Sequence, residues 1–182
     1  MAKTRESCLI CQIVANNIPS YKVYEDDTAL AALYFNRANP GHCFIIPKNH
    51  YPIIEQVPND ELGHLFSIAN KISSAIFESL KAQGTNVFVA NGIPAGQTVA
   101  HFMINVIPRK ENDGIGLQWG PKQLSEEEMS TVELKLKENM HGMAVESPEK
   151  KESPKSHAER PKPFISDEGE EDYFMNQLRK IP

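Results

Sequence analysis

Residues 101–107 carry the pattern that most restricts how this chain can fold. Their sequence, HFMINVI, separates His101, Met103 and Asn105 from one another by single apolar residues. Successive side chains of a β-strand point to opposite faces of the sheet. We therefore predict a strand that places these three residues on one face. The opposite face would turn Phe102, Ile104 and Val106 toward a helix.

One long helix is predicted between residues 58 and 84. Pro58-Asn59-Asp60-Glu61 is a plausible start, and Gly84 is a plausible stop because glycine readily adopts the left-handed conformation that ends helices. Between them apolar residues recur at three- and four-residue intervals, which indicates one buried helix face. That face consists of Leu62, Leu65, Phe66, Ala69, Ile72, Ile76 and Leu80.

Four further strands are predicted from short apolar runs bounded by turn residues. Two of them flank an Asp-Asp turn, one follows Pro40-Gly41, and one precedes the loop GIPAGQT. Short antiparallel strands with one long helix indicate an α+β fold. The four strands are expected at residues 21–25, 28–35, 42–48 and 86–91.

The composition of the chain changes after residue 124. Residues 125–140 predict another helix, because Ser125 and Glu128 have the spacing of a capping box. Residues 141–165 are rich in Pro, Glu, Lys and Ser, which predicts a disordered linker. Residues 166–182 regain apolar side chains and predict a short amphipathic helix that docks on the domain or on a partner. The first domain would therefore span residues 1–140.

Charge and hydropathy exclude several classes of protein. The net charge of -5 arises entirely after residue 124, since residues 1–124 hold 10 basic and 10 acidic side chains. Without a basic excess, nonspecific nucleic-acid binding is not expected. No apolar run is long enough to span a membrane, and the N-terminus lacks the apolar core of a secretion signal. We expect a cytoplasmic protein.

Three cysteines are present, and two of them form the motif Cys8-Leu-Ile-Cys11. In a cytoplasmic chain this motif favours a metal site or a redox pair over a disulfide framework. Structural zinc takes four ligands, so the motif alone is an incomplete site. Two buried cysteines packed as small apolar groups would explain it equally well.

Several short motifs resemble those of the histidine triad (HIT) family. Gly96-Gln97-Thr98 precedes the strand at 101–107, and Ile107-Pro108-Arg109 closes it. An earlier strand is bounded by Pro40-Gly41-His42 and by Ile46-Pro47-Lys48-Asn49-His50. The resemblance covers residues 7–140. It implies a HIT-like fold of about five antiparallel strands with one long helix packed on the sheet, and a symmetric homodimer.

The resemblance also implies a site, and this chain departs from it. In the family, the middle histidine of the triad attacks the α-phosphate of a nucleotide and forms a nucleotidyl-histidine intermediate. Met103 occupies that position here, and Asn105 occupies that of the third histidine. Tyr34 stands where the family usually has an aspartate for the ribose. Positions of the phosphate- or ribose-binding loops correspond to Asn91, Gln97 and Thr98.

A thioether is uncharged and a weak acceptor, so Met103 can neither attack a phosphate nor exchange protons. We expect a catalytically degenerate protein that binds a purine nucleotide or a related phosphate ligand. These residues are compatible with a site that no longer binds nucleotides and with a site adapted to another ligand. Two alternatives stay open: an active nucleotide hydrolase or nucleotidyl transferase with a non-standard site, and a dimeric scaffold through which the acidic tail binds a protein partner.

Within the family, a subset with an N-terminal C-x-x-C motif holds a zinc ion. Its ligands are that cysteine pair, the histidine after the Pro-Lys strand and the first histidine of the triad. The corresponding residues Cys8, Cys11, His50 and His101 are all present. The resemblance therefore implies a structural zinc, which would contribute directly to folding.

Overall fold

The computed structural model describes residues 5–140. The predicted linker at 141–165 and the predicted helix at 166–182 lie outside the described residues. The chain divides into one compact unit of residues 1–120 and a second of residues 121–182. Within the described part, no helix is both long and apolar enough to cross a membrane.

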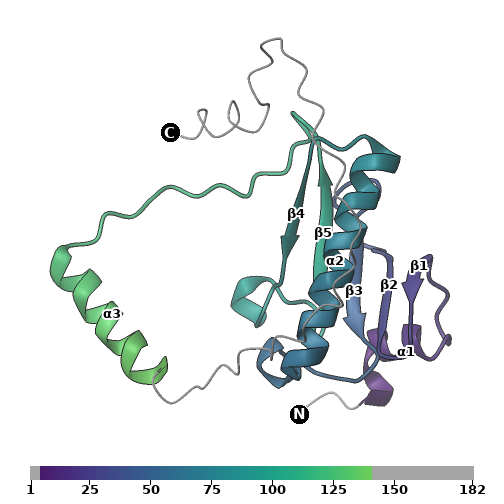
Figure 1. The fold of residues 1–182 in the computed structure, drawn as a ribbon, viewed down its shortest axis with the longest axis horizontal. Coiled ribbons are helices and arrows are strands. Elements are labelled where there is room, and N and C mark those ends of the chain that lie inside the picture. The colour runs from purple at the N-terminus through teal and green to yellow at the C-terminus, as the bar shows by residue number, and fades with distance from the viewer. Residues whose placement is uncertain (1–4, 141–182) are drawn as a thin grey trace, which may run out of the picture. The chain divides into compact units, whose positions relative to one another are not determined.

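The first unit is built on one antiparallel sheet of five strands (Figure 1). The strand order is β1-β2-β3-β5-β4, so β3 and β5 lie inside the sheet while β1 and β4 form its edges. The α+β class and the five-stranded sheet are confirmed. The strands are β1 (Lys22–Glu25), β2 (Ala29–Leu33), β3 (Cys43–Pro47), β4 (Gly84–Phe88) and β5 (Ile104–Arg109).

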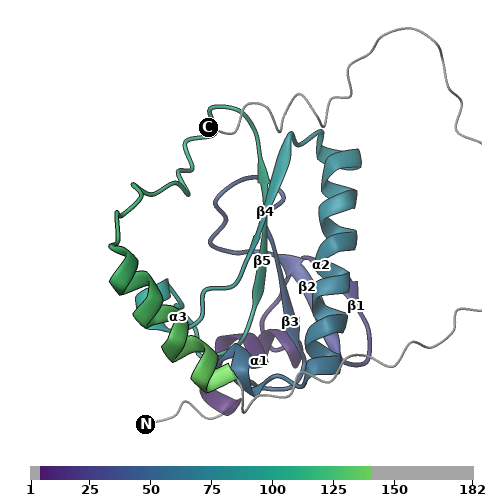
Figure 2. The ribbon, with the colours of Figure 1, turned by 60° about the vertical axis from the view of Figure 1, so that its left-hand side comes forward.

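A single long helix, α2 (Asn59–Leu80), runs along one face of the sheet (Figures 1 and 2). Its buried residues pack against the side chains of β5 and of the segment before it, which confirms the predicted helix-facing side of residues 101–107. Burial of large aliphatic and aromatic side chains stabilises a fold by about 1.5–3 kcal/mol each. The central contacts join Leu65, Ile68, Ala69 and Ile76 to Phe102, Ile104 and Val106.

The opposite face of the sheet carries a second apolar cluster that the sequence analysis missed. It is formed by a short helix, α1 (Leu9–Val14), whose Ile10 and Ile13 are buried against β2 and β3. Six residues give too short a periodicity to predict a helix. Because both faces are covered, the central residues of β2 and β3 are buried.

Several predicted element boundaries are wrong, among them the strand predicted at 86–91, which spans Gly84–Phe88. Helix α2 ends at Leu80, and Lys81 takes the left-handed conformation at φ 51°, whereas Gly84 begins β4. The predicted strand at 101–107 starts at Ile104, where pairing with Ile45 of β3 begins. Before it, the His101 N–H donates to the Val99 carbonyl, a turn-like contact.

Short 3-10 turns span Arg5–Ser7, Ile54–Gln56 and Ile93–Ala95. In the second unit, helix α3 (Glu126–Met140) confirms the helix predicted at 125–140. Its capping box is formed as expected, since the Glu128 N–H donates to Ser125 Oγ and the Ser125 N–H donates to Glu128 Oε2. The side chains of α3 are exposed.

A carboxylate connects the turn between β1 and β2 to helix α2. Asp26 accepts hydrogen bonds from Tyr24 and from His64 of α2, each at 2.7 Å. It also accepts the backbone N–H groups of Thr28 and Ala29. Burial raises the pKa of Asp26, but these hydrogen bonds outweigh it and hold the pKa well below its usual range.

We expect Asp26→Asn to destabilise the protein by about 1 kcal/mol at pH 7, because an amide has one acceptor oxygen and cannot replace both carboxylate oxygens. Oδ2 of Asp26 accepts the two side-chain hydrogen bonds, and Oδ1 accepts the two backbone N–H groups. The folded-state pKa is depressed, so this contribution is present above the unfolded pKa of about 4 and is lost as the pH falls toward the folded value. Urea unfolding at pH 7 and pH 3 measures it. The exposed neighbour Asp27, changed to Asn, is the control, and equal effects of the two changes would contradict the prediction.

Candidate functional site

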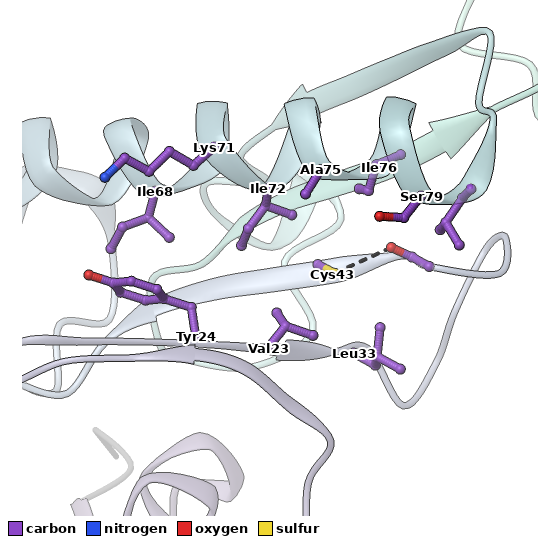
Figure 3. A pocket seen from close by; sticks show the side chains of 12 residues that line it. Val23, Tyr24, Leu33, Cys43, Ile68, Lys71, Ile72, Ala75, Ile76 and Ser79 are labelled. Atoms are coloured by element: carbon purple, nitrogen blue, oxygen red, sulfur yellow. Dashed lines mark hydrogen bonds between the residues drawn. The ribbon is translucent and has the colours of Figure 1, made fainter.

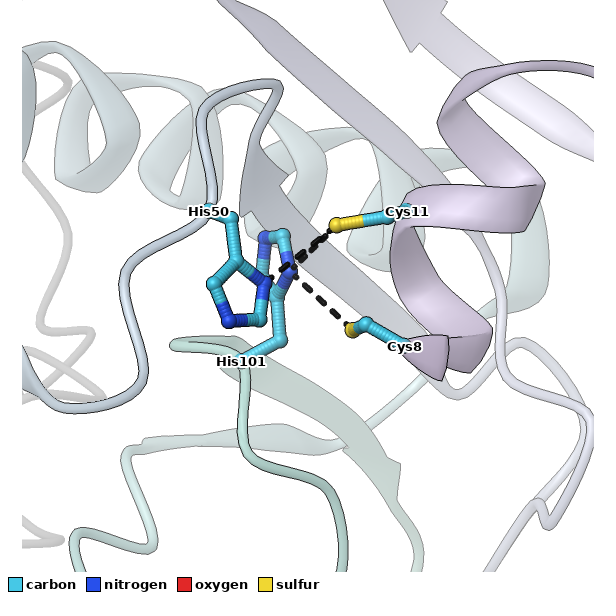
Figure 4. A group of neighbouring side chains, drawn as sticks. All are labelled: Cys8, Cys11, His50 and His101. Carbon is cyan, nitrogen blue, oxygen red and sulfur yellow. Dashed lines mark hydrogen bonds between the residues drawn. The ribbon is translucent and has the colours of Figure 1, made fainter. Parts of the chain in front are cut away.

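Four side chains from three separate parts of the chain converge beside helix α1 (Figure 4). Cys8 and Cys11 come from the start of this helix, His50 from the loop after β3, and His101 from the segment before β5. Their ligand atoms all lie within 4.8 Å of one another. The structure thus brings together all four residues that the resemblance assigned to zinc.

The spacing of these atoms fits a tetrahedral ion. Cys8 Sγ and Cys11 Sγ each lie 3.6 Å from His101 Nδ1, and Cys11 Sγ lies 3.3 Å from His50 Nδ1. Zinc–sulfur and zinc–nitrogen bonds of ordinary length imply a sulfur–nitrogen edge of about 3.6 Å. The cluster is therefore compatible with a metal ion bound by two thiolates and two imidazoles.

The environment of His101 suits a metal ligand. Its ring is fully buried, and Nε2 donates to the Pro47 carbonyl at 3.0 Å, which leaves the Nδ1 lone pair facing the sulfur atoms. Burial lowers the pKa of His101 to about 4, so the imidazole is neutral at physiological pH. Burial and the neighbouring Cys8 raise the pKa of Cys11 to about 11. A bound cation would therefore have to displace the thiol proton.

A separate cavity of about 200 Å³ opens on the same side of β5. Tyr34, Gln97, Thr98, Met103 and Asn105 all line it, so five of the predicted site residues meet in one place. Asn91 is not among its lining residues. The Asn91 side chain instead accepts the Ile54 N–H and donates to Glu55.

The loop beside this cavity is held by Gln97. Its amide oxygen accepts the Gly92 N–H at 2.7 Å, and its amide nitrogen donates to the carbonyls of Pro52 and Val99. Gly92 and Gly96 both have φ of 89°, a conformation that favours glycine. Gln97 thus shapes the loop. The next residue, Thr98, lines the cavity, and its hydroxyl has no hydrogen-bond partner among the described residues.

The only imidazole that lines this cavity belongs to His42. Its Nδ1 accepts the Ala38 N–H at 3.1 Å, and its Nε2 lies 3.2 Å from Asn105 Oδ1. Burial lowers the pKa of His42. The ring also packs against Tyr34, with centroids 4.8 Å apart. Both ring nitrogens are therefore engaged within the protein.

Met103 separates the cavity from the cluster of cysteines and histidines. Its side chain lines the cavity and packs against the apolar cluster that contains Cys8 and Cys11. Sequence reasoning did not place Asn36, His42 and Phe88 in this site. His42 lies at a motif position that suggested only a structural role, and the other two residues belong to no motif.

A different groove of about 370 Å³ lies between α2 and the first three strands (Figure 3). Its walls are mostly apolar, with Val23 and Leu33 from the sheet and Ile68 and Ile72 from the helix. None of the predicted site residues lines it. The buried Cys43 at its floor donates to the Gly41 carbonyl.

The family model of the HIT domain matches residues 15–112, more than half of the chain. The chain belongs to the histidine triad family. Adenylylsulfatase HINT3 of Arabidopsis thaliana is 39% identical over 60% of this chain, which spans 55% of that relative's length. Adenosine 5'-monophosphoramidase HNT1 of Candida albicans is 29% identical over 74% of this chain and 91% of its own.

Solved HIT structures share the fold. A HIT-family protein from Bacillus subtilis superposes with a TM-score of 0.68 at 32% identity, covering 72% of this chain and 95% of its own. A zinc-bound histidine triad protein from Mycobacterium smegmatis gives a TM-score of 0.59 at 28% identity. That comparison covers 77% of this chain and all of the other.

Proposed function

We propose that this protein is a zinc-stabilised HIT protein that binds a purine nucleotide without forming a nucleotidyl-histidine intermediate. The observation that carries this proposal is that, among residues 5–140, no imidazole at the cavity has a free nitrogen. His42 uses both nitrogens within the protein, and the His101 ring belongs to the cysteine–histidine cluster. Met103, at the nucleophile position, supplies no basic atom.

The choice of a purine nucleotide is supported by the shape of the site and by two relatives. Tyr34 lines both the polar cavity and an adjoining cavity of about 380 Å³, whose walls include Leu9, Ile13 and Phe44. The larger cavity is lined mostly by aliphatic and aromatic side chains together with Arg37, and the smaller one by amide and hydroxyl groups as well as apolar side chains. Two such adjoining cavities suit a planar base joined to a phosphate. The names of the Arabidopsis and Candida relatives both describe the chemistry of adenylyl compounds.

Restoring the two missing histidines tests whether their replacement abolished nucleophilic catalysis. We expect Met103→His with Asn105→His to raise the hydrolysis of adenosine 5'-monophosphoramidate by at least about 100-fold, because a nucleophile returns to a preformed pocket. The unaltered protein should hydrolyse this substrate no faster than the Met103→Ala variant. Steady-state assays of the four proteins, including Asn105→His alone, measure this. Faster turnover by the unaltered protein than by Met103→Ala would favour the active alternative.

Zinc is proposed to tie the N-terminal segment to the sheet. The four ligand atoms fit a tetrahedral ion, and the structure of the mycobacterial relative contains zinc. When bound, the ion would stabilise the fold and supply no step of a reaction, because all four of its positions would be taken by protein. The thiols of Cys8 and Cys11 form no disulfide, so both are available as ligands.

We expect elemental analysis to find about one zinc per chain, and Cys11→Ala to lose it. The loss should lower the midpoint of thermal unfolding by about 10 °C, since metal binding contributes to folding free energy. Cys43→Ala is the matched control, because Cys43 is buried but lies outside the cluster. Zinc retained by Cys11→Ala, or lost equally from Cys43→Ala, would contradict this assignment.

A symmetric homodimer is proposed through the β4 edge of the sheet and helix α2. Of the strands in the described part of the chain, β4 pairs with β5 alone, and its Val87 is 42% exposed. Phe66 and Phe77 of α2 are exposed as well. Unpaired strand edges with apolar side chains favour association with a second chain.

We expect Val87→Lys to halve the mass measured by light scattering, because a charge at a strand edge opposes pairing. Val23→Lys, at the opposite edge in β1, is the matched control and should leave the dimer intact. A monomeric unaltered protein, or dissociation caused by Val23→Lys alone, would refute the proposed interface.

A further inference from the structure

The groove between α2 and the first three strands lies on the opposite face of the sheet from the polar cavity (Figure 3). It follows α2 from Ile68 to Leu80, which corresponds to about 18 Å of helix. Its volume of about 370 Å³ therefore gives a mean cross-section of about 20 Å². An α-helix is about 10 Å wide, and a paired strand occupies roughly 5 by 10 Å, so neither fits inside. The groove is narrow enough for a single alkyl chain.

The groove stays open on the helix side because small side chains line it there. Ala75 and Ser79 are four residues apart and therefore lie on the same side of α2. Both residues are exposed, whereas Ile68 and Ile76 of the same helix are buried in the core. The helix thus covers the centre of the sheet and leaves the side toward β1 open.

An irregularity in β1 supplies the opposite wall. The pairing of β1 with β2 shifts in register between Lys22 and Tyr24, and Val23 lies at this shift. Successive residues of a regular strand point to opposite faces, but such irregularities re-aim a side chain. Here Val23 and Tyr24 both line the groove. Val23 is 51% exposed, so the wall presents an apolar surface that an apolar ligand would cover.

Lys71 places one positive charge at an end of the groove. Among the residues that the structure describes, it is the only charged one in the lining, and its amine has no ion pair or hydrogen bond there. Figure 3 shows its side chain extending away from Ser79, so the nitrogen lies at the end marked by Ile68 and Tyr24. An anionic head group finds a partner at this end, whereas a cationic one finds no carboxylate in the lining.

The acidic group at this end is already engaged. Tyr24 donates its hydroxyl proton to Asp26 at 2.7 Å, and Asp26 also accepts from His64 and from two backbone N–H groups. Asp26 forms an ion pair with His64 and none with Lys71. The Lys71 amine is therefore available to a ligand.

We propose that this groove binds a free fatty acid of medium chain length, with its alkyl chain along Val23 and Ile72 and its carboxylate at the Lys71 amine. An extended chain of ten carbons is about 12 Å long, given single bonds of about 1.5 Å, and fits within the length of the groove. The site lies on the other face of the sheet from the proposed nucleotide site, and its readouts do not depend on nucleotide binding.

Isothermal titration calorimetry with unbranched fatty acids tests the apolar part of the site. We expect the affinity to rise about fourfold with each added CH₂ group from hexanoate through octanoate to decanoate, because each group buries further apolar surface. AMP should not displace octanoate. An affinity that does not rise with chain length, or an absence of binding, would overturn the proposal.

Lys71→Met tests the charge, because it keeps an unbranched side chain and removes the amine. We expect it to weaken octanoate binding about fivefold, as loss of a partly exposed ion pair would, and to leave the binding of 1-octanol unchanged. Lys135→Met, at an exposed position of α3, removes the same charge elsewhere and should leave both affinities unchanged. Equal effects of the two substitutions on octanoate would contradict the role of Lys71.

Ala75→Trp tests the location, because it places a large ring in the groove from an exposed position of the helix. We expect it to prevent the binding of both octanoate and 1-octanol. Ser74→Trp, at an exposed position of α2 outside the groove, is the matched control and should leave both affinities unchanged. If the unaltered protein binds no octanoate and Ala75→Trp lowers the mass measured by light scattering, the groove belongs to a second copy of the chain and the proposal fails.

Methyl resonances of the unaltered protein give a measurement that does not depend on how a variant folds. Octanoate should shift the resonances of Val23 and Ile72 and leave those of Leu9 and Ile13 unchanged, since the latter two line the apolar cavity beside Tyr34. Shifts of Leu9 and Ile13 instead, or displacement of octanoate by AMP, would place the fatty acid in that cavity and overturn its assignment to the groove.

Discussion

The alternation of side chains from His101 to Val106 is the constraint on which the rest of the structure depends. Phe102, Ile104 and Val106 pack against α2 and form the core on that face of the sheet. His101, Met103 and Asn105 face α1 and the cavity. There they lie near the two cysteines, a second histidine and the loop that carries Gln97 and Thr98. A shift of one residue would reverse both faces, so the large apolar area buried under α2 also holds the polar residues in place.

Within this segment, one residue belongs to the cluster proposed to stabilise the fold and two others belong to the proposed ligand site. His101 joins the buried cysteine–histidine cluster, whereas Met103 and Asn105 line the cavity two and four residues later. Replacing a ligand of the cluster would leave buried polar groups without partners, which is costly. Met103 and Asn105 lie outside the four-ligand cluster, so replacing them leaves the cluster complete. The proposed loss of nucleophilic chemistry beside a complete metal cluster follows from this difference.

Much of the fold could be predicted because it depends on periodic patterns. The long apolar stripe of α2 and the capping box of α3 are local signals, and both helices formed close to their predicted positions. Helix α1 was missed because a helix of six residues depends on packing against β2 and β3 rather than on its own periodicity. Gly84 was wrongly predicted to end α2, because Lys81 already adopts the left-handed conformation directly after Leu80.

The sequence by itself determined the residue types of the site: four metal-ligand side chains, a thioether where a nucleophile is expected, and an amide two residues later. Motif spacing also placed Gln97 and Thr98 beside the cavity. Only the tertiary structure decided how these groups are used. Asn91 and Gln97 hold loops together, and His42 reaches Asn105 across 63 positions of sequence. Hydrogen bonds between distant segments depend on strand register and helix packing, which no local pattern encodes.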